Sequence, residues 1–176
     1  MKKILVIAAL ALVSFANAQK GTYLVAGNLD FNSTKTDDFK TNNFEFAPKV
    51  GYQFSDNMTV GIESVIGSQK DGDDKSNNLK VGGFLRYAKS LNSPFAIYAD
   101  LSAGYQSKKD ITDLKSKGFY VGIVPAVAID LKKSFALNFS IGGLGYDSMK
   151  PDGGKATNTF DFNFGRSFSI GVSKNF

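Results

Sequence analysis

The chain has 176 residues, a formal net charge of +5, no cysteine and no histidine. Without cysteine there is neither a disulfide framework nor a thiolate metal site, and without histidine the commonest metal ligand and the usual general base are missing. The positive charge is spread along the chain, and no basic run is long enough to predict a nucleic-acid surface. We therefore expect no cofactor, no metal site and no nucleic-acid partner.

The first 18 residues have the layout of a cleaved secretory signal. The segment MKKILVIAALALVSFANA has a basic head at Lys2 and Lys3, an apolar stretch over 4–15 and a small-residue site that ends at Ala18. A membrane-anchoring helix is the alternative, but the apolar stretch is shorter than the run of about 20 residues that a spanning helix needs. The sequence therefore predicts a signal peptide over 1–18 and an exported domain over 19–176.

Large apolar residues alternate with polar or small ones along the whole exported part. In NNFEFAPKVGYQF they stand at even positions from Phe44 to Phe54, with residues such as Glu45, Lys49 and Gly51 between them. A period of two is typical of a β-strand with one apolar and one polar face. The same pattern predicts eight strands, over 23–31, 44–54, 60–66, 79–87, 95–105, 119–131, 135–141 and 160–172.

The predicted connections alternate between short and long. The connections at 55–57, 89–94 and 132–134 are short, whereas the segments 33–41, 68–77, 107–117 and 147–158 are longer and rich in Lys, Asp, Ser, Asn and Gly. Short turns at one end and longer polar loops at the other are typical of an outer-membrane β-barrel with an even number of strands. This arrangement predicts that both ends of the mature chain lie on the periplasmic side.

The volume of the apolar side chains predicts that they point outward. The interior of an eight-stranded barrel has room only for side chains that fill it, or for one small ligand. Most of the 16 phenylalanines cannot fit there, whereas the opposite face of Gly, Ala, Ser, Asn and Thr suits a narrow polar lumen. An outward apolar face is stable in lipid, where the sheet must also close on itself. A soluble β-sandwich or lipocalin-like barrel is the alternative.

Two strand–turn–strand units resemble those of a known family. The segments PKVGYQFSDNMTVGIE and FYVGIVPAVAIDLKKSFALNFSIGGLGY are similar to units of the small, eight-stranded outer-membrane β-barrel domain family of Gram-negative bacteria. The resemblance implies an all-β, antiparallel, up-and-down transmembrane barrel in the cell outer membrane. The C-terminal residues Phe168, Ile170, Val172 and Phe176 resemble the signal by which the outer-membrane assembly machinery recognises its clients. Lys174 departs from the apolar residue often found at its position.

Four charged residues are predicted to form a neutral cluster inside the barrel. A tight turn centred on residue 56 places Lys49 opposite Glu63, and Arg86 and Asp100 flank the next short turn at a similar height. Because an isolated buried charge is costly, we expect these residues to pair. Three inward aromatic residues add bulk and favour a filled lumen: Phe84, Tyr98 and Tyr120. The cluster is expected to fill and specify the interior, and a path for a substrate or ion is the alternative.

Three classes of function are considered for such a barrel. The preferred one is a non-enzymatic protein with a structural role, or with a surface ligand bound by the segments 33–41, 68–77, 107–117 and 147–158. The alternative is a narrow porin-like channel or carrier for small or apolar solutes, which requires a less filled lumen. An enzyme of this type usually needs a nucleophile and an imidazole base, and the chain has no histidine; a Ser–Lys pair is the remaining arrangement, and no spacing singles one out. Pro48 and Pro125 fall within predicted strands and are expected to mark bulges.

Overall fold

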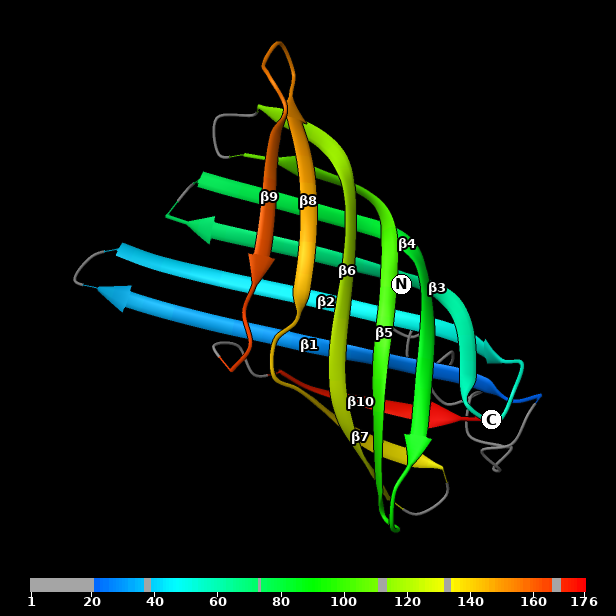
Figure 1. The fold of residues 1–176 in the computed structure, drawn as a ribbon. Coiled ribbons are helices and arrows are strands. Elements are labelled where there is room, and N and C mark those ends of the chain that lie inside the picture. Colours follow the sequence, from blue (N-terminus) through cyan, green and yellow to red (C-terminus); the bar gives the residue numbers. More distant parts are fainter. Residues whose placement is uncertain (1–20, 37–38, 73, 111–113, 132–133, 166–168) are drawn as a thin grey trace.

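The computed structural model describes residues 21–36, 39–72, 74–110, 114–131, 134–165 and 169–176. The predicted signal peptide at 1–18 lies outside these residues. No helix in the described part of the chain is long and apolar enough to cross a membrane. The described residues form ten β-strands that belong to one antiparallel sheet (Figure 1).

The chain runs along the barrel wall eight times, alternately up and down. The strands are β1 (Tyr23–Thr36), β2 (Phe39–Gln53), β3 (Met58–Asp71), β4 (Asp74–Ser90), β5 (Phe95–Lys109), β6 (Lys115–Asp130), β7 (Phe135–Ser140), β8 (Leu144–Pro151), β9 (Thr157–Phe162) and β10 (Ser169–Asn175). β7 and β8 together make the seventh pass, and β9 and β10 make the eighth. The pairings of β5 with β6 and of β1 with β10 close the ring β1-β2-β3-β4-β5-β6-β7-β10. The fold is the predicted all-β, eight-stranded, up-and-down barrel.

The two ends of the described chain close the barrel at its turn end, which carries the connections 54–57, 91–94 and 131–134. β1 pairs with β10 from Leu24, opposite Asn175, to Asn28, opposite Gly171. The Tyr23 amide donates to the Phe176 carbonyl at 3.0 Å, and the Phe176 amide donates to the Tyr23 carbonyl at 2.9 Å. In hydrocarbon an unpaired backbone group is costly, so this pairing stabilises the wall.

Apolar side chains cover the outer wall. The ladder pairs outward residues with outward residues, for example Leu29 with Phe46 and Phe31 with Phe44. Phe31 and Ile62 keep 68% and 69% of their surface exposed. The buried apolar residues, by contrast, all stand on the inward side of their strands: Leu24, Phe84, Tyr120, Ala126, Ala128 and Ala136. A soluble barrel requires the opposite distribution, so the soluble alternative is excluded.

The four segments predicted as long loops consist mostly of strand. The described strands leave only 37–38, 72–73, 110–114 and 152–156 as connections at this loop end. Polar cross-strand contacts continue the ladder here, since Ser33 Oγ donates to Asn42 Oδ1 at 2.8 Å and Thr41 Oγ1 donates to Asp71 Oδ1 at 2.9 Å. The predicted loops at 33–41, 68–77, 107–117 and 147–158 were wrong, because the change to polar residues marks the membrane edge and not the strand ends.

The single strand predicted over 160–172 was also wrong, because the eighth pass is divided into β9 and β10. The seventh pass is divided beside it, between β7 and β8. Gly142 and Gly165 have φ values of +102° and +76°, which side chains other than glycine rarely adopt. The Gly143 amide donates to Asn163 Oδ1 at 2.8 Å, and the Gly165 amide donates to the Ile141 carbonyl at 2.8 Å. The β8–β9 hairpin is therefore joined to the closed ring through two breaks that contain glycine.

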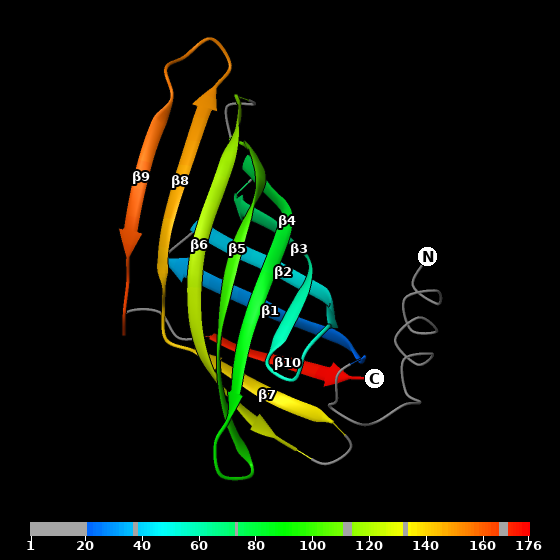
Figure 2. The same ribbon diagram turned by 45° about the vertical axis from the view of Figure 1, so that its right-hand side comes forward.

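Beyond these breaks the wall has a seam between β1 and β9, and Figure 2 shows β9 at the free edge of the sheet. β1 pairs with β10 only as far as Asn28, and β9 pairs with β8. Among the described residues, no strand pairs with the edge of β1 over 29–36 or with the outer edge of β9. Phe31 and Phe160 stand on these two strands and are 68% and 66% exposed, so the seam reaches into the apolar band.

Pro48 and Pro125 lie within strands, but only Pro125 lies at a bulge. β2 keeps one register with β1 and one with β3 on both sides of Pro48, so the bulge predicted there is wrong. Opposite Pro125 the two neighbouring strands contain different numbers of residues. Because Ala126 pairs with Ser140 and Ile123 pairs with Leu144, two residues of β6 face three residues, 141–143. A proline has no amide to donate, and it therefore suits a position where the partner strand already interrupts the ladder.

Candidate functional site

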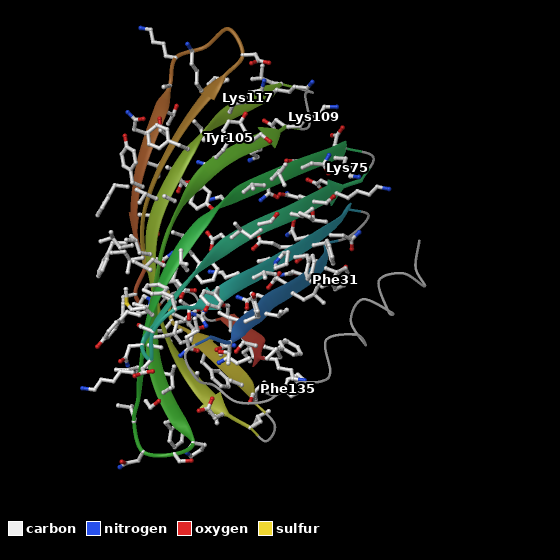
Figure 3. All side chains as sticks on the ribbon, turned by 90° about the vertical axis from the view of Figure 1, so that its right-hand side faces the viewer. Phe31, Lys75, Tyr105, Lys109, Lys117 and Phe135 are labelled. Carbon is white, nitrogen blue, oxygen red and sulfur yellow. The ribbon has the colours of Figure 1, made fainter. Side chains whose placement is uncertain are left out.

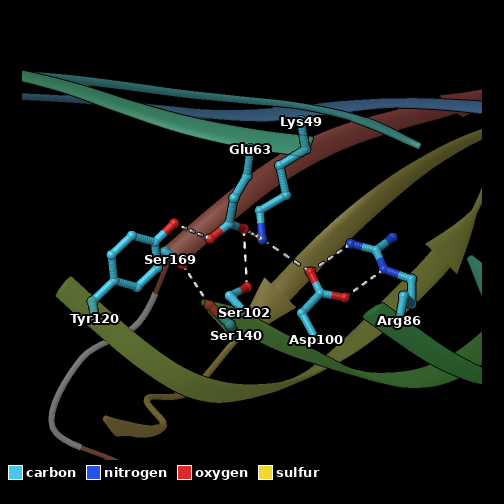
Figure 4. Close-up of polar contacts among 8 residues, drawn as sticks. All are labelled: Lys49, Glu63, Arg86, Asp100, Ser102, Tyr120, Ser140 and Ser169. Carbon is cyan, nitrogen blue, oxygen red and sulfur yellow. Dashed lines mark hydrogen bonds and ion pairs between the residues drawn. The ribbon is translucent and has the colours of Figure 1, made fainter. Parts of the chain in front are cut away.

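The barrel interior holds a network of charged side chains (Figure 4). Lys49 Nζ lies 2.7 Å from Glu63 Oε2 and 3.0 Å from Asp100 Oδ2. Arg86 donates through Nε to Asp100 Oδ1 at 2.7 Å and through Nη2 to Asp100 Oδ2 at 2.9 Å. The structure thus brings together the four charged residues singled out in the sequence, as two cations and two carboxylates that neutralise each other.

Two neutral side chains complete this network. Ser102 Oγ donates to Glu63 Oε2 at 3.0 Å, and Tyr120 Oη donates to Glu63 Oε1 at 2.9 Å. Sequence reasoning placed Tyr120 inside the barrel but missed Ser102. Ser102 follows Asp100 by two residues on the same strand face, and this spacing could have placed it inside the lumen. We refer to Lys49, Glu63, Arg86, Asp100, Ser102 and Tyr120 as the lumen network. Its contacts join β2 to β5 and β3 to β6, so they cross the lumen as well as follow the wall.

Except for Lys49, which is partly exposed, the residues of the lumen network are buried, and its carboxylates are fully paired. Asp100 is 3% exposed and Glu63 is 8% exposed. A buried charge is costly unless it is paired and hydrogen-bonded, and each oxygen of these two carboxylates accepts from a cation or a hydroxyl. The Arg86 guanidinium also lies 3.8 Å from the ring centre of Tyr98 and 5.9 Å from that of Phe84. The network and these rings fill the section of the lumen in which they lie.

Glycines make room for the inward rings. Gly82 pairs directly with Gly104 across β4 and β5. A Cβ on Gly104 would lie 2.9 Å from the ring of Tyr120, and a Cβ on Gly51 would lie 3.0 Å from the ring of Phe84. The rings therefore occupy the space that inward side chains at these positions would need. Small inward residues on one strand and large ones on another make the filled interior.

On the loop side of the lumen network lies a cavity of about 1040 Å³, which we call the vestibule. Lys80 Nζ lies 3.1 Å from Asp147 Oδ1 there, and Gln106 Nε2 donates to the same oxygen at 2.7 Å. Sequence reasoning missed Asp147 because it assigned 147–158 to a loop, although alternation from 144 onward would have placed it inward. Leu29 and Ile170 also line the vestibule, and they stand directly after the last pair of β1 with β10, so the cavity reaches the start of the seam.

The C-terminal residues with the resemblance to an assembly signal lie on or next to β10. Phe168 is outside the described residues, and the other three are Ile170, Val172 and Phe176. Lys174 Nζ lies 4.7 Å from the ring centre of Phe135 and 4.5 Å from that of Phe176, in a cation–π arrangement that accommodates a charge on an apolar wall. Recognition of this segment by the assembly machinery stays a prediction.

The ion pairs and hydrogen bonds of the interior connect strands to one another. Within the described ranges, no group of three or more acidic side chains is placed to hold a metal ion. The carboxylate oxygens of Glu63 and Asp100 already accept from protein donors. The contacts of the lumen network therefore connect the five strands β2 to β6 to one another across the lumen.

Comparison with known families and solved structures relates this geometry to other proteins. The family described as outer membrane protein beta-barrel domain matches residues 4–176. The chain belongs to this outer-membrane β-barrel family. The family resemblance seen in the sequence is thereby confirmed, and membership implies association with the lipid bilayer of the outer membrane. Comparison with curated protein sequences gives no significant match.

Two solved structures are similar to this member of the family over nearly its whole length. Neisserial surface protein A is 14% identical with a TM-score of 0.60, and the match covers 93% of this chain and all of that chain. The outer membrane protein OprG from Pseudomonas aeruginosa is 16% identical with a TM-score of 0.53, and the match covers 90% of this chain and 97% of that chain. At these identities the likeness shows the fold alone.

Proposed function

We propose that the protein is a non-enzymatic, non-conducting barrel of the outer membrane, with both mature termini in the periplasm. The observation that carries the proposal is the lumen network, whose side chains meet across the interior at 2.7–3.0 Å. A filled lumen leaves the loop end as the surface on which the protein meets other molecules. The polar strand extensions beyond the apolar band supply that surface.

The energetics of the lumen network favour a structural role. A water path would have to separate Lys49 from Glu63 and Asp100, and breaking a buried ion pair is strongly destabilising. Phe84 and Tyr120, which are 3% and 8% exposed, close the space beside these charges. An eight-stranded barrel has little interior volume beyond what side chains fill. A structural barrel therefore fits the interior better than an aqueous channel does.

The proposal is tested by conductance. The purified protein is expected to give no stable single-channel currents in planar lipid bilayers, because the lumen network blocks the water path. Combined Lys49→Ser and Glu63→Ser substitutions remove both crossing side chains and no net charge, and we expect measurable currents from this variant.

A matched pair outside the lumen network is the control for this experiment. Lys80→Ser combined with Asp147→Ser removes the ion pair of the vestibule and again leaves the net charge unchanged. This variant is expected to stay silent like the unaltered protein. Stable currents from the unaltered protein would overturn the proposal and favour the narrow channel.

The seam favours a second candidate function, a carrier for small apolar solutes. Leu29 and Ile170 line the vestibule at the point where the pairing of β1 with β10 ends and the seam begins. An apolar solute dissolved in the membrane could enter the vestibule at this point without crossing the lumen network. The route would run between β1 and β9 and would not require an aqueous pore.

Titration calorimetry with toluene tests the second candidate. The protein in lipid nanodiscs, corrected for empty nanodiscs, is expected to bind toluene, and Leu29→Asn should weaken binding about tenfold because it removes apolar surface at the seam. Leu101→Asn makes the same change on the closed part of the outer wall and should leave the affinity unaltered. Equal effects of the two substitutions, or heats no larger than those of empty nanodiscs, would rule out a seam route.

A further inference from the structure

The register of the sheet places lysine opposite lysine at the loop end. Four pairs face each other directly: Lys35–Lys40 across β1 and β2, Lys70–Lys75 across β3 and β4, Lys109–Lys115 across β5 and β6, and Lys117–Lys150 across β6 and β8. Like charges directly opposite each other destabilise a sheet. A negative counter-charge would therefore stabilise four such pairs at one end of the barrel.

All eight of these lysines occupy outward positions of their strands. They share the face of the apolar outer wall, as Lys109 does with Tyr105 and Lys117 does with Phe119. The acidic residues of the described strands all occupy inward positions: Asp30, Glu45, Glu63, Asp71, Asp74, Asp100, Asp130, Asp147 and Asp161. Along the described strands the two signs of charge are therefore sorted between the two faces.

Seven of the lysines also keep a constant spacing from the apolar band. Lys117 stands two residues from Phe119, and the other seven stand four residues beyond the last outward apolar or aromatic residue of their strands, in the pairs Phe31–Lys35, Phe44–Lys40, Ile66–Lys70, Leu79–Lys75, Tyr105–Lys109, Phe119–Lys115 and Tyr146–Lys150. Four strand residues extend about 13 Å. At the tilt of barrel strands this is roughly 10 Å along the membrane normal. The flexible stems of lysine can place the ammonium groups within the lipid headgroup layer.

Figure 3 shows the result of this spacing. Lys109 and Lys117 lie beyond Tyr105 and Lys75 lies beyond Phe31, all toward one end of the barrel, and Phe135 lies toward the opposite end. The described strands carry only two further outward lysines, Lys89 and Lys174, and both are at the turn end. The outward positive charge of the described side chains is therefore concentrated at the loop end and is distributed over β3 to β6 and β8.

Five of the eight lysines are exposed and have no acidic partner within the part of the chain that the structure describes: Lys70, Lys75, Lys115, Lys117 and Lys150. Two inward lysines differ from them, since Lys49 and Lys80 each lie within 3.1 Å of a carboxylate. The ammonium groups of these five outward lysines are thus available to a ligand, whereas those of the two inward lysines are paired within the protein.

We propose that six of these outward lysines, Lys70, Lys75, Lys109, Lys115, Lys117 and Lys150, which we call the lysine belt, bind the phosphate groups of anionic lipids in the outer leaflet. Phosphates of lipid headgroups lie at this depth on every side of a membrane barrel, and anionic headgroups attract lysines near the surface. A single docked protein would contact one side of the wall, whereas the belt follows five strands, β3 to β6 and β8. The inference rests on the proposed topology for the choice of leaflet and is independent of whether the lumen conducts.

The test measures how strongly the protein retains lipid A, a phosphorylated glycolipid. The protein is reconstituted in nanodiscs of phosphatidylcholine with lipid A, and native mass spectrometry gives the number of lipid A molecules that stay bound. Combined Lys70→Gln, Lys75→Gln, Lys115→Gln, Lys117→Gln and Lys150→Gln substitutions are expected to lower this retention about tenfold. Arginine at the same five positions should preserve it, and lipid A without its phosphates should be retained by neither protein.

A matched variant changes lysines outside the belt. Lys108→Gln removes an inward lysine at the loop end, Lys89→Gln removes an outward lysine at the turn end, and both should leave retention unaltered. Unchanged retention in the five-glutamine variant would overturn the proposal. So would complete displacement of lipid A by inorganic phosphate, or a loss of heparin binding with no loss of lipid A, which would assign the belt to a free anion or to a soluble acidic polymer. Conductance does not enter any of these readouts.

Discussion

Replacement of Asp100 by alanine is expected to lower the free energy of unfolding of the barrel by about 3–5 kcal/mol. Asp100 is the only carboxylate within the described residues that contacts both Arg86 and Lys49, at 2.7–3.0 Å. Without it, two buried cations share one carboxylate, Glu63. The unfolding free energy can be measured in lipid vesicles with urea and circular dichroism, since the chain has no tryptophan for fluorescence.

Two further variants separate charge from packing in this experiment. Asp100→Asn keeps the shape of the side chain but removes the charge, and we expect most of the loss to remain. Asp130→Ala removes an inward carboxylate that is exposed and forms no ion pair among the described residues, and it should change stability by less than about 0.5 kcal/mol. Similar losses for Asp100→Ala and Asp130→Ala would show that the lumen network does not stabilise the barrel.

The fold could be predicted from the sequence because lipid makes the alternation informative. A strand with hydrocarbon on one side and a narrow polar lumen on the other must alternate at every position, and residues such as Phe44, Phe46 and Val50 follow this rule. The outer wall therefore identified the strands, their faces and the barrel. The same physical cause produced the errors. Outside the membrane both faces meet water, the contrast disappears, and strand residues such as Ser33 and Asn42 look like loop residues.

The breaks in the seventh and eighth passes could not be predicted from the same signal. Phe160, Phe162 and Phe164 continue the alternation up to the break, and nothing in that pattern marks where the ladder ends. The break depends on backbone angles at Gly142 and Gly165 and on hydrogen bonds between two segments that are 20 or more residues apart. Such contacts follow from the closed barrel, which is known only once all strands are placed.

The four charged residues of the lumen could be singled out because tight turns fix the register. A turn centred on residue 56 requires Lys49 to face Glu63, and Arg86 pairs directly with Asp100. Contacts across the lumen, such as Tyr120 with Glu63, depend on the diameter of the barrel and were not predictable in the same way. The lysine belt was hidden for a different reason. The segments 33–41, 68–77, 107–117 and 147–158 were assigned to loops. The sequence analysis therefore did not place their lysines on one face of a strand.

Replacement of Gly82 by valine is expected to destabilise the barrel by about 3 kcal/mol or to prevent its folding. A Cβ at Gly82 would overlap the carbonyl oxygen of Ala103 and lie 2.5 Å from Tyr120 Oη and 2.8 Å from Gly104 Cα. The backbone atoms cannot move without disturbing the β4–β5 ladder. The tyrosine hydroxyl can move only by giving up its hydrogen bond to Glu63, which is 2.9 Å long. Urea unfolding in lipid vesicles measures the loss.

The neighbouring glycine provides a control on the opposite face of the same strand. Gly83 points outward, and a Cβ there would meet only the carbonyl oxygen of Gly61, at 3.5 Å. Valine has a high preference for strands and is apolar, so Gly83→Val should leave stability unchanged or raise it, since it also reduces the entropy of the unfolded chain. Strand preference and backbone entropy act equally at both positions, so the difference between the two variants isolates packing in the lumen. Equal stability of the two proteins would mean that the Tyr120 ring does not need the space above Gly82, and the account of a filled interior would then fail.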